Sequence, residues 1–294
     1  MAFTSAGFPS ELVREVFVNA KGHSALAKLA RQEPLAFSGT DLMVFSFDGE
    51  VNLVAEGAAK AAHTNGKDFV KMVPLKVEYG ARVTDEFLRA SDEKQLDIMR
   101  GFTDGFGKKI ARGLDIMAMH GVNPATGTAA TTLIGTNSLD TNTSVTSVTY
   151  VPATPDPEGN ILTGITALGD NDFTGLIIDK TFAGELAKVK VNGVPQYPEL
   201  AWGANPERIK GVASDINSTV SAVTGKHGYM GDFENYFRWG YADMINFDVI
   251  EYGDPDGQGD LKRYNQVYLR AEAWYGWAIL DGAAFVRIEE ASNP

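Results

Sequence analysis

The sequence predicts an α+β protein built around one long helix and several extended strands. Two runs, from Leu42 to Val54 and from Phe69 to Val83, alternate apolar and polar side chains with a period of two, as half-buried strands do. From Leu96 to Met117, apolar side chains recur every three or four positions, as on one face of a helix. From Gly231 onward the pattern is mostly that of strands. With 294 residues, 44% of them hydrophobic, the chain can fill a sizeable core.

The composition excludes several classes of protein. A formal charge of -12, from 38 acidic and 26 basic residues, argues against a surface built to grip phosphates. The absence of cysteine excludes disulfides, thiolate metal sites and a thiol nucleophile. No window of about 18 uncharged apolar residues occurs, as a membrane-spanning helix would need, and the first residues lack a secretory signal pattern. We therefore expect a soluble chain that is not exported.

The elements predicted in the first 70 residues have no evident surface to pack against within this segment. Residues 10–30 have a helical pattern but are too few to fold alone, so we expect them to lie across another surface. The stretch NLVAEGAAKAAHTNGKDF, residues 52–69, is small and polar and separates the two strand-like runs. It is therefore predicted to form the tip of a two-stranded arm. Because a two-stranded ribbon is marginal in water, its partner must come from this chain or from another copy.

The long helix has recognisable ends. Ser91 and Asp92 are candidate N-caps, and Gly121 followed by Pro124 predicts its end. Internal glycines cost roughly 1 kcal/mol each relative to alanine on an exposed helix, so they make sense where neighbours approach the backbone closely. There are four of them: Gly101, Gly105, Gly107 and Gly113.

The second half of the chain alternates short elements. Residues 128–149 are rich in Thr, Ser, Val and Asn, which favours short strands and turns, and VPATPDPEGN is predicted to be a connection. The final run, QVYLRAEAWYGWAILDGAAFVRIEE, predicts a strand, a Gly-Ala-Ala turn and another strand. The other predicted elements are a helix at 162–168, a buried strand at 176–178 and a helix at 181–188.

Few motifs for chemistry are present. The four histidines are widely spaced, and there is no HExxH pair, GxSxG elbow or P-loop. GFTDGFG at 101–107 lies inside the helical pattern, which is the wrong context for a nucleotide loop. An α+β enzyme that uses carboxylates as general acid and base remains a remote alternative.

One acidic segment has the spacing of a calcium loop. In DPDGQGDLKRYN, the residues Asp254, Asp256 and Gln258 stand at positions one, three and five of an EF-hand-like loop. Position twelve is Asn265, where such a loop needs a bidentate glutamate. A polar turn rich in Asp and Gly is therefore favoured, with calcium binding as the alternative.

The order of several segments along the chain resembles that of tailed-bacteriophage major capsid proteins. The segments are AEGAAK, FVKMVPLKVEYGARVTDEFL, LDIMAMHGVNPATG, GLIIDKTFAGELAKVKVNGVPQY, RIKGVASDINSTV, GDFENYFRWGYADMINFDVIEY and NQVYLRAEAWYGWAILDGAAFVRI. The resemblance covers nearly the whole chain in order, although no single segment is highly specific.

The resemblance implies the α+β fold that tailed phages share with herpesvirus capsids and encapsulins. Such a chain has an N-terminal arm (1–45), an extended two-stranded loop (46–80), a peripheral domain carrying a long spine helix (81–127 and 243–294) and an axial domain (128–242). The arm and the extended loop would then find their partners on neighbouring copies.

The implied function is that of a structural major capsid protein without a cofactor. Copies would assemble through pentamers and hexamers into an icosahedral or prolate head that encloses double-stranded DNA, as part of a virion assembled in the cytoplasm of a host bacterium. Further expected partners are a portal and a decoration protein. Since only about 40 residues precede the extended loop, we also expect a separate scaffolding protein. An encapsulin-like shell enclosing cargo enzymes is the alternative. The net negative charge fits an inner wall along which DNA can slide.

The resemblance also implies contact residues in the extended loop. Glu56, Gly57, Lys60 and Lys67 are expected to touch the neighbouring subunit.

One branch of these capsid proteins joins its subunits by isopeptide bonds. The matching positions here are Lys60 as the lysine, Asn265 as the amide and Glu272 as the helper carboxylate. A neutral amine would attack the amide carbon, ammonia would leave and the glutamate would accept a proton. The alternative places Lys60 in solvent, Asn265 in a turn and Glu272 in a salt bridge.

Overall fold

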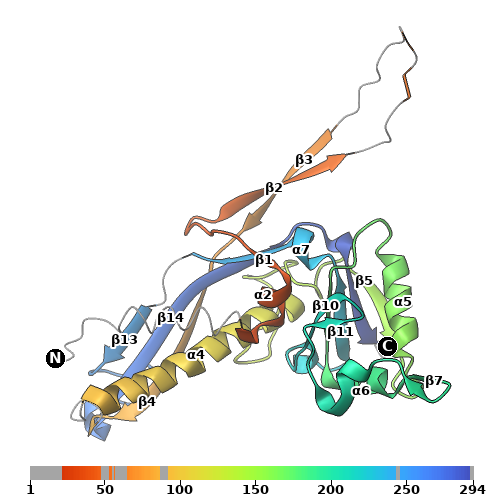
Figure 1. Cartoon of the computed structure of the whole chain (residues 1–294). Helices are drawn as coiled ribbons and strands as arrows, with labels where there is room; N and C mark the ends of the chain where they lie inside the picture. The colour runs from red at the N-terminus through yellow and green to blue at the C-terminus, as the bar shows by residue number, and fades with distance from the viewer. Residues whose placement is uncertain are drawn as a thin grey trace.

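The computed structural model describes residues 22–47, 53–54, 56, 65–86, 92–242 and 246–291. Helix α4 (Asp92–His120) and strand β14 (Gln266–Ile279) run side by side along the body, and a second group of strands and helices lies at one end (Figure 1). The hairpin of β2 (Thr40–Phe47) and β3 (Asn65–Met72) projects away from the body. This mixture of helices and strands confirms the predicted α+β fold class.

The first sheet has five strands arranged around β14. In the second half of β14 nearly every residue is buried, because both faces of the sheet are covered there. Tyr275 and Trp277 face the helical side, whereas Ala278 packs with Leu35 and Met72 on the other side. The remaining strands of this sheet are β1 (Arg31–Gln32), β4 (Leu75–Thr84), β12 (Phe237–Tyr241) and β13 (Asn246–Ile250).

The second sheet has six strands and forms the end group of the molecule. In sheet order they are β5 (Thr146–Tyr150), β15 (Phe285–Glu290), β11 (Lys226–Gly231), β6 (Gly175–Ile178), β10 (Val212–Ile216) and β9 (Arg208–Ile209). The end group also contains α5 (Pro157–Ala167), α6 (Lys180–Lys188), β7 (Lys190–Val191), β8 (Val194–Pro195), η1 (Pro198–Gly203) and η2 (Val220–Ala222).

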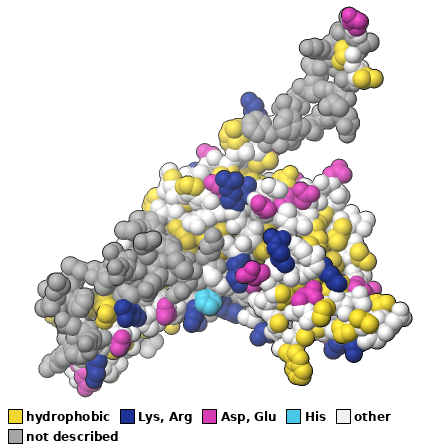
Figure 2. Space-filling model, viewed as in Figure 1, with side chains coloured by type: hydrophobic (Ala, Val, Ile, Leu, Met, Phe, Trp, Pro, Cys, Tyr) yellow, Lys and Arg dark blue, Asp and Glu magenta, His cyan; other side chains and the backbone are white. Residues whose placement is uncertain are grey.

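Two short connections join the sheets. Helix α7 (Phe233–Tyr236) leads from β11 into β12, and the turn η4 (Gly282–Ala284) leads from β14 into β15. A third short turn, η3 (Lys262–Tyr264), precedes β14. Within the described ranges no helix is both long and apolar enough to cross a membrane. Basic and acidic side chains are interspersed over the face of the body shown in Figure 2.

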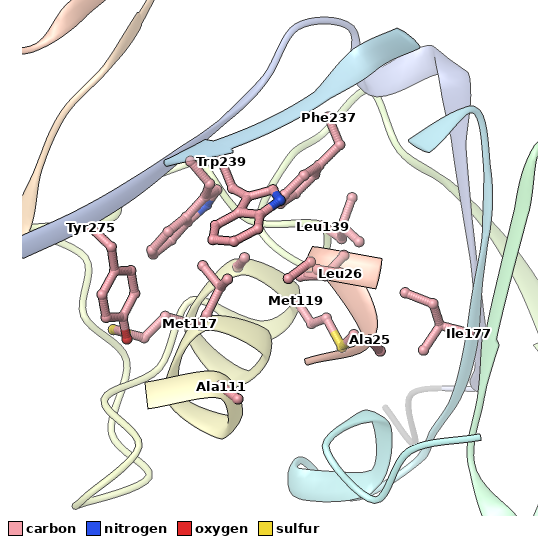
Figure 3. Packing of buried hydrophobic residues seen from close by; sticks show 14 of the residues in the cluster. Ala25, Leu26, Ala111, Met117, Met119, Leu139, Ile177, Phe237, Trp239 and Tyr275 are labelled. Atoms are coloured by element: carbon pink, nitrogen blue, oxygen red, sulfur yellow. The ribbon is translucent and has the colours of Figure 1, made fainter. Parts of the chain in front are cut away.

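The main hydrophobic core lies where the short helix α2 (Ala25–Leu29) meets α4, β12 and β14. Figure 3 shows Leu26 from α2, Met119 from α4 and Trp239 from β12 turned toward one another. All three side chains are almost completely buried. The N-terminal segment is thus part of this chain's own core from Ser24 onward. The expectation that the arm finds its partners on neighbouring copies is therefore wrong for residues 24–29, because α2 packs on α4 and β12 of the same chain.

Most elements appear where local patterns predict them. The long helix ends at His120, and Gly121 follows with a φ of +68°. The buried strand β6, the helix α6 and the succession of β14, turn and β15 are also confirmed. The predicted helix at 10–30 falls mainly outside the described residues.

The second strand-like run is two strands instead of one. The run predicted from Phe69 to Val83 divides at Val73 and Pro74: β3 pairs with β2, whereas β4 pairs with β14. Proline has no N–H to donate to a ladder, so a strand readily changes partner there. The alternating pattern continues across Pro74 and hides this division.

Two further predictions need correction. Helix α5 begins at Pro157, inside the segment predicted to be only a connection, because Asp156 caps it by accepting a hydrogen bond from the N–H of Gly159. Close neighbours explain Gly113, since a Cβ there would lie 3.0 Å from the hydroxyl of Tyr275. They do not explain Gly101, where no described atom lies within 4 Å of such a Cβ, and the same holds for Gly105.

Candidate assembly surface

The projecting hairpin offers an uncovered two-stranded ribbon. Its strands pair from Thr40 opposite Met72 to Phe47 opposite Asn65, and no third described strand joins them. Phe69 on β3 is 65% exposed, and Leu53 near the tip is fully exposed. Apolar side chains on a two-stranded ribbon need a covering layer to be stable in water. This ribbon is therefore a surface shaped for another molecule.

Both ends of the hairpin cross the first sheet at a pair of glycines. Gly240 of β12 lies directly opposite Gly276 of β14 in the ladder. A Cβ on Gly240 would collide with the carbonyl oxygen of Glu33, and one on Gly276 would collide with that of Val73. The chain enters the hairpin after Glu33 and leaves it at Val73. The two glycines thus let the backbone of both ends lie directly on the sheet.

A buried carboxylate fixes the N-terminal segment to α4. Asp115 Oδ1 accepts hydrogen bonds from Ser24 Oγ at 2.6 Å and from the N–H of Leu26 at 3.2 Å. Its Oδ2 accepts from the N–H of Ala25 at 2.9 Å and from Thr219 Oγ1 at 3.2 Å. One side chain therefore joins the start of α2, the C-terminal part of α4 and the end group.

The burial of this carboxylate also changes its titration. Asp115 is completely buried, and desolvation raises the pKa of its carboxyl to about 6, although the hydrogen bonds from Ser24, Ala25 and Leu26 oppose the change. Sequence reasoning missed this residue. The available signal was an acidic side chain within the otherwise apolar stretch LDIMAM at the end of the helix.

The predicted contact residues of the extended loop lie along the hairpin as far as the structure describes them. Glu56 is an exposed turn residue near the tip, and Lys67 is exposed on β3 opposite Phe45. Gly57 and Lys60 lie outside the described residues.

The two described residues of the predicted isopeptide site stand well apart in one copy. Asn265 is exposed, with a left-handed φ of +53°, immediately before β14. Glu272 lies within β14 and is mostly buried, with its carboxylate 2.9 Å from Lys76 Nζ and 3.5 Å from Arg270 Nε. Seven residues of continuous strand span roughly 23 Å. Asn265 and Glu272 of the same copy therefore do not share one site.

The guanidinium group of Arg82 binds the acidic segment for which calcium binding is the alternative. Arg82 Nε donates to Asp256 Oδ2 at 2.8 Å, and Arg82 Nη2 donates to the carbonyl of Gly259 at 2.7 Å and to Asp254 Oδ1 at 3.3 Å. Arg82 Nη1 donates to Gln266 Oε1 at 3.1 Å. Of the residues named for the calcium alternative, Asp254 and Asp256 thus bind a guanidinium group, together with oxygens of Gly259 and Gln266.

The ion pair between Arg82 and Asp256 stabilises the ionised form of the Asp256 carboxyl group. The hydrogen bond from Arg82 lowers the pKa of the Asp256 carboxyl to about 2. Gln258 takes part through its backbone N–H, which donates to Asp256 Oδ1 at 3.2 Å. In the part of the chain that the structure describes, no three His, Asp or Glu side chains gather in a way that could hold a metal ion. Calcium binding at this loop would require displacement of Arg82.

Comparisons with known proteins agree with this architecture. The model of the phage capsid family matches residues 6–289. A solved structure from Mycobacterium phage Ogopogo is similar with a TM-score of 0.75 and 31% identity, over 92% of this chain and 92% of that chain. One from Gordonia phage Cozz has a TM-score of 0.73 and 25% identity, over 91% and 86% of the two chains.

A more distant structure shares the fold. The capsid of an empty GTA particle has a TM-score of 0.62 at 17% identity, over 92% of this chain and 90% of that chain. Among curated proteins, none matches this chain. The family match favours a phage shell over the encapsulin-like compartment and assigns a structural role. The chain belongs to the phage capsid family and is a structural major capsid protein.

Proposed function

We propose that copies of this chain assemble through pentamers and hexamers into a closed icosahedral or prolate head that encloses double-stranded DNA. The observation that carries this proposal is the projecting hairpin β2–β3, on which Met43 and Phe69 are exposed in a single copy although Met72 at its base is buried. A contact between two different surfaces of identical chains is heterologous, and it forms a ring when the rotation closes. A hairpin lying on a neighbouring copy would supply such a contact. The surface of that copy would then cover the exposed apolar side chains of the hairpin.

Several independent contacts per subunit would make the shell stable. A subunit held by a hairpin, by its body and by an end group leaves only when all of them break together, so modest contacts add up to tight association. In this proposal residues 1–45 form an arm, 46–80 the extended loop, 81–127 with 243–294 the peripheral domain, and 128–242 the axial domain. The pairing of β4 with β14 supports counting residues 75–80 with the peripheral domain.

Further partners complete the proposed head. We infer a separate scaffolding protein, a portal and a decoration protein, with assembly in the cytoplasm of the host bacterium. The formal charge of -12 supports an interior that contacts DNA without holding it tightly, because like charges keep the polymer free to move.

Removal of the apolar surface of the hairpin should prevent assembly without unfolding the body. In a Met43→Ser and Phe69→Ser double variant, both exposed side chains lose the apolar area that a neighbour would cover. We expect the fraction of protein in particles, measured by sedimentation velocity and electron microscopy, to fall at least about tenfold. The matched control is Lys71→Ser, an exposed position on the same strand, which should assemble like the wild type.

Two outcomes would count against this proposal in different ways. A wild-type chain that stays monomeric under all conditions, with its neighbouring genes co-expressed, contradicts the shell. Equal assembly of the double variant and the wild type contradicts only the role of the hairpin.

An isopeptide bond between subunits is a separate part of the proposal. It would join Lys60 of one copy to Asn265 of another, with Glu272 supplied by a different copy from the one that supplies Asn265, since the two lie far apart along β14. Mature particles boiled in detergent should then give a ladder, and Lys60→Arg particles a single band at 31.7 kDa. A single band at 31.7 kDa from wild-type particles would exclude the bond.

A further inference from the structure

A tryptophan of the end group, Trp202, is fully exposed. Trp202 lies in η1 with a left-handed φ of +60°, a conformation that bulky residues rarely adopt. Two residues earlier, Leu200 is buried in the core of the end group. Tyr197 holds the start of this turn, because its hydroxyl donates to Glu158 Oε1 at 2.8 Å. The indole is therefore held outward by a fixed backbone, and strain of this kind points to a role at the surface.

The segments on either side of Trp202 in the sequence carry exposed apolar and basic side chains. Val191 and Val194, on the neighbouring β7–β8 hairpin, are more than half exposed. Figure 2 shows hydrophobic and basic side chains side by side at the lower right, where Figure 1 places β7. We give the name tip surface to the exposed side chains of residues 188–210 that are either large and apolar or basic: Val191, Val194 and Trp202 with the cations Lys188, Lys190, Arg208 and Lys210.

A second uncovered surface, on helix α5, has the opposite charge. Leu162 and Ile165 lie three residues apart on one face of the helix and are exposed. The exposed acids Asp156, Asp170 and Asp172 stand at its two ends. Residues 113–179 contain no lysine or arginine at all, so no basic side chain of this segment offsets them. These five residues form what we call the α5 surface.

We propose that the tip surface of one copy docks on the α5 surface of a second copy, with Trp202 packed against Leu162 and Ile165. This inference rests on the proposed assembly and names one of its contacts. Tryptophan is among the residues that contribute most to interfaces when it is desolvated in a pocket. The basic rim of the tip surface would face the acidic ends of α5, which favours association and fixes its orientation.

The opposite charges of the tip surface and the α5 surface favour a second copy of this chain as the binding partner. Both complementary halves are present on this one chain, and each is uncovered in a single copy. A chain with a formal charge of -12 repels its own copies at long range, so their approach needs a local region of opposite sign. The tip surface supplies that region, because residues 188–211 hold four cations against Glu199 and Glu207. Of the four, Lys188 is paired with Glu185 at 2.6 Å, so the excess of positive charge comes from Lys190, Arg208 and Lys210. Because the two halves differ, the contact is heterologous and suits a ring.

An exchange of charges tests the pairing. A Lys190→Glu and Lys210→Glu variant and an Asp170→Lys and Asp172→Lys variant should each lower self-association of the full chain by about tenfold or more at low salt. The quadruple variant restores opposite charges and should recover most of the association, measured by sedimentation velocity. As a mismatched control, Lys190→Glu and Lys210→Glu combined with Asp260→Lys, an exposed acid in another loop, should stay defective.

The Trp202→Gly substitution tests the effect of the indole on self-association without an expected loss of folding stability. Trp202→Gly removes the indole while a left-handed φ becomes favourable, so the thermal midpoint of the single copy should stay level or rise. Self-association should nevertheless fall about tenfold. Asn192→Gly is the matched control, since Asn192 also has a left-handed φ, of +50°, at the turn of the β7–β8 hairpin. It should associate like the wild type.

These experiments distinguish an error in the proposed Trp202 contact from an error in the proposed assembly as a whole. A wild-type chain that never associates contradicts both the proposed assembly and this contact. A wild-type chain that assembles while Trp202→Gly assembles equally well, or while the quadruple variant stays as weak as its parents, overturns this contact alone. Unchanged self-association of both charge-reversal variants would also overturn it and would assign the tip surface to a different protein.

Discussion

Replacement of Asp115 with alanine should destabilise the fold by about 4 kcal/mol, since it leaves buried donors without an acceptor. The N–H groups of Ala25 and Leu26 donate hydrogen bonds to this carboxylate. Because both residues are buried, water cannot replace the carboxylate as their acceptor. Each orphaned buried N–H costs roughly 1–3 kcal/mol, and the cavity left by the carboxylate adds to this. Denaturant unfolding of the single copy measures the loss.

Asparagine at this position should cost less, about 2 kcal/mol, because the amide keeps the shape and one acceptor. The exposed Asp97 on the same helix is the control, and its alanine variant should stay within about 0.5 kcal/mol of the wild type. Equal stability of Asp115→Ala and Asp97→Ala would refute the anchoring role.

The raised pKa of Asp115 gives the same site a pH dependence of defined sign. Its folded-state pKa of about 6 exceeds the ordinary value of 3.8, so the folded chain binds the proton more tightly between these pH values. The stability that this group contributes is fully present below the lower value and is lost as the pH rises through about 6. The free-energy gap between wild type and Asp115→Asn should therefore be wider at about pH 4.5 than at about pH 7. An equal gap at both pH values would contradict this assignment.

The elements that sequence reasoning found are those specified by local patterns. Helix α4 has an apolar residue every three or four positions and a glycine directly after it, and β6 is a short apolar run followed by the capping residue Asp179. Such signals lie within one element and need no knowledge of the rest of the fold. The alternation on either side of Pro74 is equally local, and for that reason it could not reveal that β3 and β4 join different sheets.

The contacts that organise the molecule are remote in sequence. Ser24 and Asp115 are 91 residues apart, and Arg82 and Asp256 are 174 residues apart. A single aspartate in a sequence does not indicate which donors will reach it after folding. The acidic segment at 254–265 illustrates the limit: its residues favour a polar turn with calcium binding as the alternative, and they do not reveal that Arg82 of β4 binds Asp256 and the carbonyl of Gly259. Trp202 was missed for a related reason, because only the fold shows which tryptophans stay uncovered.

Substitution of Gly276 by alanine should destabilise the fold by about 3 kcal/mol and displace the hairpin from the sheet. The added Cβ would meet the carbonyl oxygen of Val73, and a backbone atom cannot turn aside as the end of a flexible side chain can. Gly240→Ala should have a similar effect through Glu33, at the other end of the hairpin. Hydrogen exchange of the β2–β3 ladder and denaturant unfolding measure the two consequences. Gly184→Ala on α6 is the control: among the described residues outside its own turn of helix, no atom lies within 4 Å of a Cβ at this position, so the substitution should be neutral or stabilising.

The double variant distinguishes a local clash from a shared response. Both clashes are relieved by one movement, the lifting of the hairpin from the sheet, so Gly240→Ala and Gly276→Ala together should cost clearly less than the sum of the single losses. If the losses of unfolding free energy are additive, each strand distorts independently, and the two glycines do not support the hairpin jointly. If they do act together, the pair sets the direction in which the hairpin leaves the body. Single variants that still fold should then fail to assemble, because a hairpin that points elsewhere no longer reaches the copy that would cover it.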